Sequence, residues 1–374
     1  MILDTKDFKD CCQTILFAID NKDVSLFTET LELVTDGTNL NLNVTNREYF
    51  TTVTFALPEE EKFRASVNAK TFLSLISKIT TDTIELKVTE NVLKIKANGE
   101  YTLPLIYNND QILELPKIDL GEITSEMVIP GSVLQSILIN NSKELLRGAD
   151  IIKRSSANPV QKYYYIDNQG AITFTSGACV NNFTLSKEIK LLLSDKVVRL
   201  FKLFKGNPEV KFYMGQVPIS EDIIQTTVRF KTPNIELTAK LTDSALISSV
   251  PVSAVRGMAT KTYPYTMVID KNQLMEALNR ILLLDEDSRT YGNIIAKGNT
   301  LTVQAFSGSG KETIISTGES KNIEEYKMIL DLKNLKLVLD GCEEDYITIC
   351  FGDSRAVVFK KQSVSDIIPE LKIS

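Results

Sequence analysis

One arrangement of residues occurs three times along the chain and sets the strongest limit on its fold. The first copy, residues 70–88, reads KTFLSLISKITTDTIELKV. Its apolar side chains have the spacing of one helix face: Phe72, Leu75, Ile76 and Ile79. Thr80, Thr81 and Asp82 then favour a turn, and apolar and charged residues alternate after them as in a half-buried strand. The segment therefore predicts one short helix followed by a strand.

The same order returns in segments 196–214 and 332–351. The stripe of the second copy is Val197, Leu200, Phe201 and Phe204, and that of the third is Leu332, Leu335 and Leu339. A further helical stripe precedes each copy, at residues 8–19, 133–138 and 274–281. Alternating segments with turn signals lie between the paired helices and predict hairpins at 30–44, 163–176 and 294–306. We expect an α+β fold of three repeated domains, 1–120, 121–250 and 251–374, each with two helices packed on antiparallel sheets.

Composition narrows the class of protein. The chain has 374 residues, of which 43% are hydrophobic, and no run approaches the roughly 18 apolar residues of a membrane span. The polar, acidic N-terminus is unlike a secretory signal. Five cysteines without ligand spacing indicate reduced thiols in the cytoplasm and no metal site. The absence of histidine removes the commonest general base and metal ligand.

An enzyme is the main alternative class. The most suggestive motif is FSGSGKET at 306–313, but Glu312 follows Lys311 where a phosphate-binding loop needs Ser or Thr, and Ala305 occupies the place of its first glycine. A hairpin loop explains the motif better. The carboxylate pairs lie in polar runs without a partner base, so we expect no catalytic residue, no cofactor and no enzymatic activity.

The net charge of −6 argues against a protein that coats nucleic acid over its whole surface. A local basic face is still present in segment 196–205, where the cations lie opposite the apolar stripe: Lys196, Arg199, Lys202 and Lys205. An ordinary solvated helix face is the alternative. A basic helical lining within an acidic protein would bind a phosphate backbone without reading bases.

Three helix–meander repeats in a chain of this length resemble the bacterial β sliding clamp of DNA polymerase III. The local stretches that resemble the family are ISKITTDTIELKVTENVLKIKANGEYTLPLI, KYYYIDNQ…AITFTSGACV and the terminal DIIPELKIS. Departures from the family suggest a divergent clamp, with a phage or plasmid origin as an alternative to a host origin. Ala178 replaces a histidine, Ile368 replaces a methionine, and an interdomain arginine has no clear counterpart.

The resemblance implies a processivity factor for DNA replication: a head-to-tail homodimer whose six domains form a ring around duplex DNA, independent of sequence. It implies a cytoplasmic, nucleoid-associated protein without membrane contact. The cations expected to face DNA are Lys6, Lys9, Lys22, Lys78, Lys143, Arg147, Lys196, Arg199, Lys202, Lys205, Lys333 and Lys336.

The family recruits DNA polymerase and the clamp loader through short peptides bound in a cleft between its second and third domains. The positions that match this cleft are Tyr164, Tyr165, Thr175, Gly177, Val180, Ile247, Val252, Ser354, Ala356, Ile368 and Pro369. The ring interface would pair edge strands of the first and third domains, and maps to Tyr101, Leu103, Leu283 and Leu284. Packing within a domain is the alternative explanation for these apolar residues.

A second alternative stays within the fold. Acidic residues intersperse the lysines of the first helix, and the expected cleft is altered. Both features fit a clamp-like decoy or heteromeric partner that binds polymerase or clamp-loader peptides without encircling DNA.

Overall fold

The computed structural model describes residues 1–20, 25–143, 158–175, 177–220, 223–241, 244–284, 290–318, 323–340, 342, 344–353 and 355–372. The chain forms two compact units. Unit 1 comprises residues 1–135 and 196–243, and unit 2 comprises residues 136–195 and 244–374. The chain passes between the units three times: in α3 (Gly131–Asn140), at the start of α5 (Asp195–Arg199) and between residues 243 and 244. Within the described residues, no helix has the length and apolarity that a membrane span requires.

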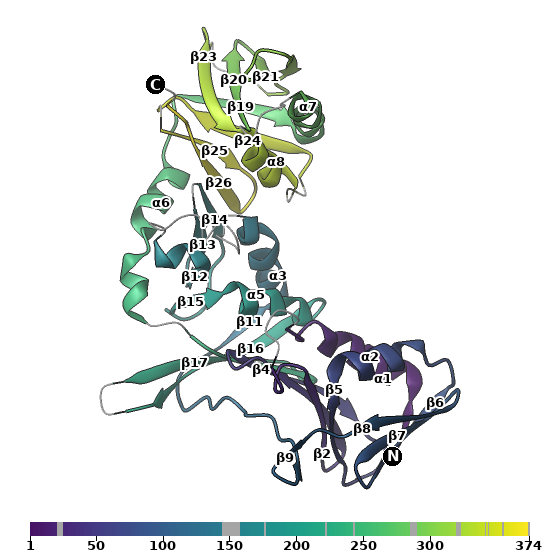
Figure 1. Cartoon of the computed structure of the whole chain (residues 1–374). Helices are drawn as coiled ribbons and strands as arrows, with labels where there is room; N and C mark the ends of the chain where they lie inside the picture. Colours follow the sequence, from purple (N-terminus) through teal and green to yellow (C-terminus); the bar gives the residue numbers. More distant parts are fainter. Residues whose placement is uncertain are drawn as a thin grey trace. The chain divides into compact units, whose positions relative to one another are not determined.

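Unit 1 is built on an eight-stranded antiparallel sheet with strand order β11-β16-β17-β18-β4-β3-β2-β5 (Figure 1). These strands are β2 (Thr30–Asp36), β3 (Asn39–Thr45), β4 (Tyr49–Ala56), β5 (Arg64–Asn68), β11 (Glu122–Pro130), β16 (Glu209–Pro218), β17 (Ile224–Lys231) and β18 (Ile235–Lys240). A four-stranded sheet has the order β1-β6-β7-β8, from β1 (Ile2–Asp4), β6 (Thr83–Thr89), β7 (Val92–Lys96) and β8 (Glu100–Pro104). The short strands β9 (Tyr107–Asn108) and β10 (Gln111–Ile112) pair with each other.

Alternation along the strands gives the large sheet of unit 1 one apolar and one polar face. Helices α1 (Thr5–Leu16) and α2 (Ala69–Lys78) pack together beside the sheet. Phe8 of α1 lies 5.7 Å, between ring centroids, from Phe55 of β4. The 3-10 helix η3 (Leu200–Phe204) covers the other half of this face, where the rings of Phe201 and Phe230 are 5.1 Å apart. Polar side chains of the same strands occupy the opposite face.

Unit 2 repeats this plan with an eight-stranded sheet of order β15-β12-β13-β14-β26-β25-β24-β19 and a four-stranded sheet of order β22-β21-β20-β23. The strands of the large sheet are β12 (Tyr163–Asp167), β13 (Gly170–Phe174), β14 (Ala178–Asn182), β15 (Lys190–Ser194), β19 (Tyr265–Asp270), β24 (Tyr346–Phe351), β25 (Ala356–Lys360) and β26 (Val364–Pro369). Those of the small sheet are β20 (Tyr291–Lys297), β21 (Thr300–Ala305), β22 (Lys311–Ile315) and β23 (Tyr326–Asp331).

Helices α7 (Lys271–Leu283) and α8 (Leu332–Asp340) pack together in the larger core of unit 2. A second core lies under α6 (Val252–Thr260), which contacts β14 and β26. The remaining elements of the described residues are the 3-10 helices η1 (Asn141–Lys143), η2 (Pro159–Lys162) and η4 (Ser244–Ser249). Each large sheet takes strands from two of the three predicted domains, and the three-domain division itself stays a prediction.

The structure confirms the predicted α+β class, the antiparallel sheets and the paired helices. Asx residues start four of the α-helices by accepting backbone N–H bonds: Asp4, Asn68, Asp270 and Asp331. The three predicted hairpins are present, with turns that follow Asp36, Asp167 and Lys297. The second turn lies one residue earlier than the expected Gln169-Gly170, because Gly170 already pairs with Asp167. FSGSGKET forms the hairpin between β21 and β22 rather than a phosphate-binding loop.

Two local expectations were wrong. Leu16 was expected in the apolar stripe of α1, but it is 50% exposed at the end of that helix. Segment 196–205 is not one α-helix, because the chain tightens into η3 after α5. Its apolar stripe is nevertheless buried as predicted, since Phe201 and Phe204 both pack on Phe230.

Candidate functional site

The basic segment of unit 1 presents cations from α5 and η3, opposite its buried stripe. Lys196, Lys202 and Lys205 are exposed, and Arg199 is half-buried. The Nζ atom of Lys196 lies 3.1 Å from Asp20 Oδ2, and that of Lys202 lies 5.4 Å from the ring centroid of Phe17. Both lysines thus pack near the end of α1. Both side chains are exposed and can attract phosphate, although Lys196 already has a carboxylate partner in Asp20.

The predicted cations of α1 and α2 differ in their surroundings. Lys6 and Lys78 are exposed, whereas Lys9 donates a hydrogen bond to the carbonyl oxygen of Ile79 at the end of α2. Lys9 therefore links the two helices and is not available as a phosphate ligand in this conformation. Lys22 lies outside the described residues.

The predicted DNA-facing lysines of unit 2 also divide into those that are accessible and one that donates a hydrogen bond to the end of a helix. Lys333 is exposed and Lys336 half-buried on α8. The Nζ atom of Lys143 instead donates to the carbonyl oxygen of Val338, at 3.2 Å, in the last turn of α8. Burial lowers the pKa of Lys143, and the charge of Asp366 opposes that effect. Lys143 therefore caps a helix end, and Arg147 lies outside the described residues.

A partly exposed apolar cluster lies where α6 and η4 cover the large sheet of unit 2. We call it the outer apolar cluster. Its buried members include Tyr165, Val180, Ala356 and Ile367, and its partly buried members are Tyr163, Phe174, Leu246, Ile247, Val252 and Met258. Five predicted cleft residues thus come together here: Tyr165, Val180, Ile247, Val252 and Ala356. Burial raises the pKa of Tyr165 to about 12.

Two of the predicted cleft residues belong elsewhere. Tyr164 is fully buried, with its hydroxyl donating to Asp195 Oδ1 at 3.2 Å, and Ile368 packs in the other core of unit 2. Successive residues of a strand face opposite sides of the sheet. Tyr163 and Ile367 therefore face the outer apolar cluster, where Tyr164 and Ile368 were expected. Strict alternation from Tyr165 would have found them.

The other predicted cleft residues lie at strand ends. Thr175 and Gly177 bound the β13–β14 turn, in which the Thr175 N–H donates to the Gly177 carbonyl at 2.9 Å. Pro369 ends β26 opposite Ala356. Ser354 lies outside the described residues.

The sequence did not reveal Arg256 of α6 as part of this surface. Its guanidinium donates two hydrogen bonds to Asp167, at 2.6 and 2.8 Å, and one to Gln169 Oε1 at 3.0 Å. Burial alone would raise the pKa of Asp167, but the bonds from Arg256 and the Gln169 backbone outweigh it and lower that pKa. The ion pair fixes α6 against the β12–β13 hairpin.

The predicted interface residues lie at two sheet edges. Tyr101 and Leu103 lie on β8, the edge strand of the small sheet of unit 1, as expected. Leu283 and Leu284 were expected on a strand, but Leu283 ends α7 and Leu284 follows it. Leu283 is 82% exposed. This helix end adjoins edge strand β22, to which Arg280 is tied by a two-point ion pair with Glu312.

Comparison with known proteins identifies the fold. No family model matches the sequence, and no curated protein matches it either. Among solved structures, the DNA polymerase sliding clamp from Pseudomonas aeruginosa is 16% identical with a TM-score of 0.82, over 100% of this chain and 99% of that one. The chain has the fold of a bacterial sliding clamp.

Clamps from distant bacteria are equally similar. The DNA polymerase III beta subunit from Thermotoga maritima gives 14% identity and a TM-score of 0.80, and the sliding clamp from Bacillus subtilis gives 15% and 0.79. Each match covers 100% of this chain and 99% of the other. The resemblance expected from the sequence is thus confirmed at the level of the fold, and the low identity fits a divergent clamp.

Proposed function

We propose that the chain is a DNA sliding clamp, a processivity factor that encircles duplex DNA and tethers a replicative polymerase. The observation that carries this proposal is the clamp fold over the full length of the chain. A ring holds DNA by topology, so it needs only weak contacts with phosphate, and the net charge of −6 is compatible with that. The role requires no catalytic residue and no cofactor.

The DNA-facing set in this proposal keeps eight cations whose side chains are exposed or half-buried: Lys6, Lys78, Lys196, Arg199, Lys202, Lys205, Lys333 and Lys336. We leave out Lys9 and Lys143, because each donates to a backbone carbonyl at a helix end. Contacts of this kind neutralise phosphates without sequence readout and permit sliding.

The outer apolar cluster is the proposed binding site for short peptides of the polymerase and the clamp loader. Its partly buried members include two aromatic rings, Tyr163 and Phe174, beside the adaptable side chain of Met258. Aromatic and methionine side chains are enriched at surfaces that bind other proteins. We leave Tyr164 and Ile368 out of this site.

The proposed homodimer joins β8 of one copy to the α7 end and β22 of the other. An edge strand has unpaired backbone groups, and the exposed Leu283 and Leu284 offer apolar contact beside one. Two such contacts related by a two-fold axis would close a ring. The protein would act at the nucleoid in the cytoplasm.

The decisive experiment measures retention on DNA. The protein would be loaded onto circular duplex DNA with a bacterial clamp loader, and retention would be compared before and after a single cut. We expect release on linearisation, because a topological link ends when the DNA has free ends. Equal retention on circular and linear DNA would contradict the proposal and indicate ordinary surface binding.

A second candidate is the clamp-like decoy, which binds partner peptides without encircling DNA. It is favoured by the acidic residues that stand among the lysines of α1, the exposed Asp7 and Asp10, and by the inward direction of Lys9 and Lys143. Failure to load on any DNA, together with capture of a polymerase peptide, would support this candidate.

A further inference from the structure

The polar face of the large sheet in unit 1 contains an unbroken row of side chains across all eight strands. Each member lies opposite the next in the strand register: Val128, Lys211, Lys231, Glu236, Thr52, Asn43, Glu32 and Ser66. We call this the cross-sheet row. Its members are exposed from β11 to β17, half-buried on β18 and β4, and buried from β3 to β5.

The buried end of the row is covered by segment 105–120. The hydroxyl of Ser66 donates to the Leu113 carbonyl at 2.6 Å, which holds the segment on the sheet. Leu113, Leu115 and Ile118 pack with Phe50 of β4 in a separate apolar cluster. Segment 105–120 thus covers one part of the polar face and is held there by this hydrogen bond and by apolar packing.

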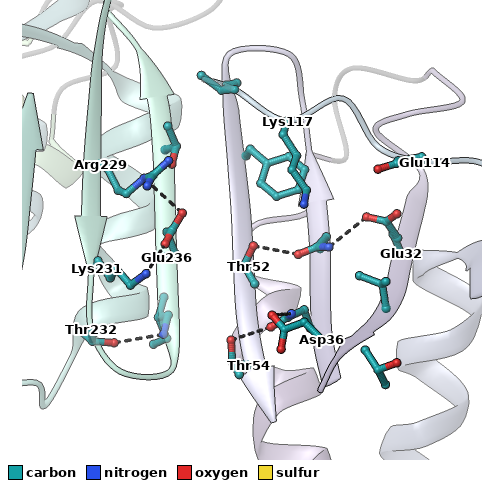
Figure 2. Close-up of a pocket in the computed structure, with 18 of the residues that line it drawn as sticks. Glu32, Asp36, Thr52, Thr54, Glu114, Lys117, Arg229, Lys231, Thr232 and Glu236 are labelled. Atoms are coloured by element: carbon teal, nitrogen blue, oxygen red, sulfur yellow. Dashed lines mark hydrogen bonds and ion pairs between the residues drawn. The ribbon is translucent and has the colours of Figure 1, made fainter. Parts of the chain in front are cut away.

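A cavity of about 440 Å³ lies between segment 105–120 and the sheet. Figure 2 shows Glu32, Glu114 and Lys117 on one side of the cavity and Arg229, Lys231 and Glu236 on the other. A second cavity, of about 640 Å³, is lined both by apolar residues that include Ile123 and Tyr213 and by charged residues that include Glu209 and Lys211. The two cavities share four residues, Arg229, Lys231, Thr232 and Pro233, so they adjoin along the cross-sheet row.

Glu32 lies at the deep end of this groove with incomplete hydrogen bonding. Its side chain is 1% exposed, and Oε2 accepts a bond from Asn43 Nδ2 at 3.0 Å. Oε1 has no hydrogen-bond partner among the described residues. The nearest cation, Arg64, is 3.9 Å from that oxygen and donates instead to Glu114 at 3.0 Å.

A buried carboxylate oxygen without a donor is costly. Burial raises the pKa of Glu32, against the opposing hydrogen bond from Asn43. A ligand that brings an ammonium, guanidinium or amide N–H to Oε1 would remove the cost. The deep end of the groove therefore selects a hydrogen-bond donor.

The open part of the groove has the opposite preference. Lys211 and Lys231 are register partners on β16 and β17, and like charges directly opposite each other destabilise a sheet. Glu236 Oε2 lies 2.8 Å from Lys231 Nζ, and Glu236 Oε1 lies 3.2 Å from Arg229 Nε. One carboxylate therefore forms ion pairs with two cations. The residues that line the second cavity include three cations, Lys211, Arg229 and Lys231, and one acid, Glu209. Even when Glu236 is added, this part of the groove has an excess positive charge that a ligand carboxylate would neutralise.

We propose that this groove binds an extended peptide segment of a partner protein, with a Lys or Arg side chain on Glu32 and an acidic side chain on Lys211 and Lys231. Strands lie about 4.8 Å apart, so four or five strand steps separate the two sites by roughly 19–24 Å. An extended peptide covers this in about six or seven residues at ~3.3 Å each. An apolar residue after the acid would meet Ile123 and Tyr213 in the second cavity.

The test uses fluorescent Ser/Gly-rich peptides with one Lys, one Asp and a Phe after the Asp. The Lys–Asp spacing would run from about four to about nine residues, around the length that the strand geometry requires. Fluorescence polarisation with the full chain should show tightest binding near a spacing of six or seven. A matched peptide with Lys and Asp exchanged should bind at least tenfold more weakly. Equal binding of the two, or no binding at any spacing, overturns the proposal.

Variants locate the site on the chain. Glu32→Gln keeps the shape of the side chain and should weaken binding at least tenfold, with the preference for Lys over the exchanged peptide lost. Lys231→Gln changes an exposed side chain and should weaken binding of the Asp-containing peptide even if Glu32→Gln does not fold. Lys94→Gln, the same change on exposed β7, serves as control and should bind as the unaltered chain does. Unchanged affinity in the folded Lys231 variant overturns the assignment.

Discussion

At the residue scale, Arg256 and Asp167 determine how firmly α6 is held on unit 2. The carboxylate side chain is 7% exposed and accepts two short bonds from the guanidinium. Two parallel bonds to one carboxylate are among the stronger polar contacts in proteins. The pair therefore positions the apolar side chains of α6 in the outer apolar cluster.

Replacing this arginine should destabilise unit 2 in a pH-dependent way. We expect Arg256→Gln to lower the free energy of unfolding by about 2 kcal/mol at pH 7. The pKa of Asp167 is lowered in the folded chain, so its stabilisation is present above its unfolded pKa of about 3.9 and is lost as the pH falls through the folded value. Urea unfolding at neutral and acid pH should show the difference between the two proteins shrinking in acid.

Arg355→Gln provides the control for this measurement. Arg355 is exposed, so its replacement should change the free energy of unfolding by less than about 0.5 kcal/mol at either pH. A destabilisation by Arg256→Gln that stays constant from neutral to acid pH would show that loss of packing, not the ion pair, is responsible.

At the scale of elements, the segment formed by α5 and η3 concentrates the surface cations of unit 1. Its apolar residues pack on the sheet and fix the backbone, while Lys196, Arg199 and Lys202 project from the other side. The helix itself is short, so its position depends on this packing rather than on helix propensity. Charge reversal on the outer side should leave the core intact.

We expect the triple change of Lys196, Arg199 and Lys202 to glutamate to weaken binding to a short DNA duplex strongly. If each cation neutralises one phosphate, the slope of log affinity against log salt concentration should become about three units shallower. Binding would be measured by anisotropy across a salt series. The control changes three exposed lysines of β6 and β7, Lys87, Lys94 and Lys96, to glutamate.

The control has the same net charge but should retain more affinity than the α5–η3 variant. If both triple variants lose affinity equally, overall charge governs DNA binding and the basic segment has no special role.

At the scale of the whole molecule, assembly depends on surfaces that one chain leaves uncovered. Leu283 is 82% exposed at the end of α7, beside an edge strand. We expect Leu283→Asp to convert the proposed dimer to monomers, because a carboxylate would be buried without a partner in the interface. Sedimentation velocity at micromolar concentration measures the change in mass.

Leu337→Asp is the matched control, since Leu337 is an exposed leucine of α8, a helix outside the proposed interface. It should sediment as the unaltered chain does. An unchanged dimer for Leu283→Asp, or a monomeric unaltered chain, would contradict the interface proposed for the α7 end.

The sequence predicted much of the local structure, because the helix and strand periods of apolar residues depend only on residues close together in the chain. The stripe containing Phe72, Ile76 and Ile79 is buried, and the alternating run after it forms β6. Site residues were harder to assign. Tyr164 and Tyr165 are adjacent residues with the same side chain, and only the register of their strand decides which one faces the outer apolar cluster.

The sequence by itself determined the repeated order of helices, hairpins and strands, since 3.6-residue and two-residue periods and turn residues act over short distances. Tertiary structure alone decided how distant strands join. β18 pairs with β4 and β14 with β26, and these pairings produce the two large sheets. Tertiary structure alone also buries Glu32 beneath segment 105–120, because cavity formation depends on contacts between residues far apart in the chain.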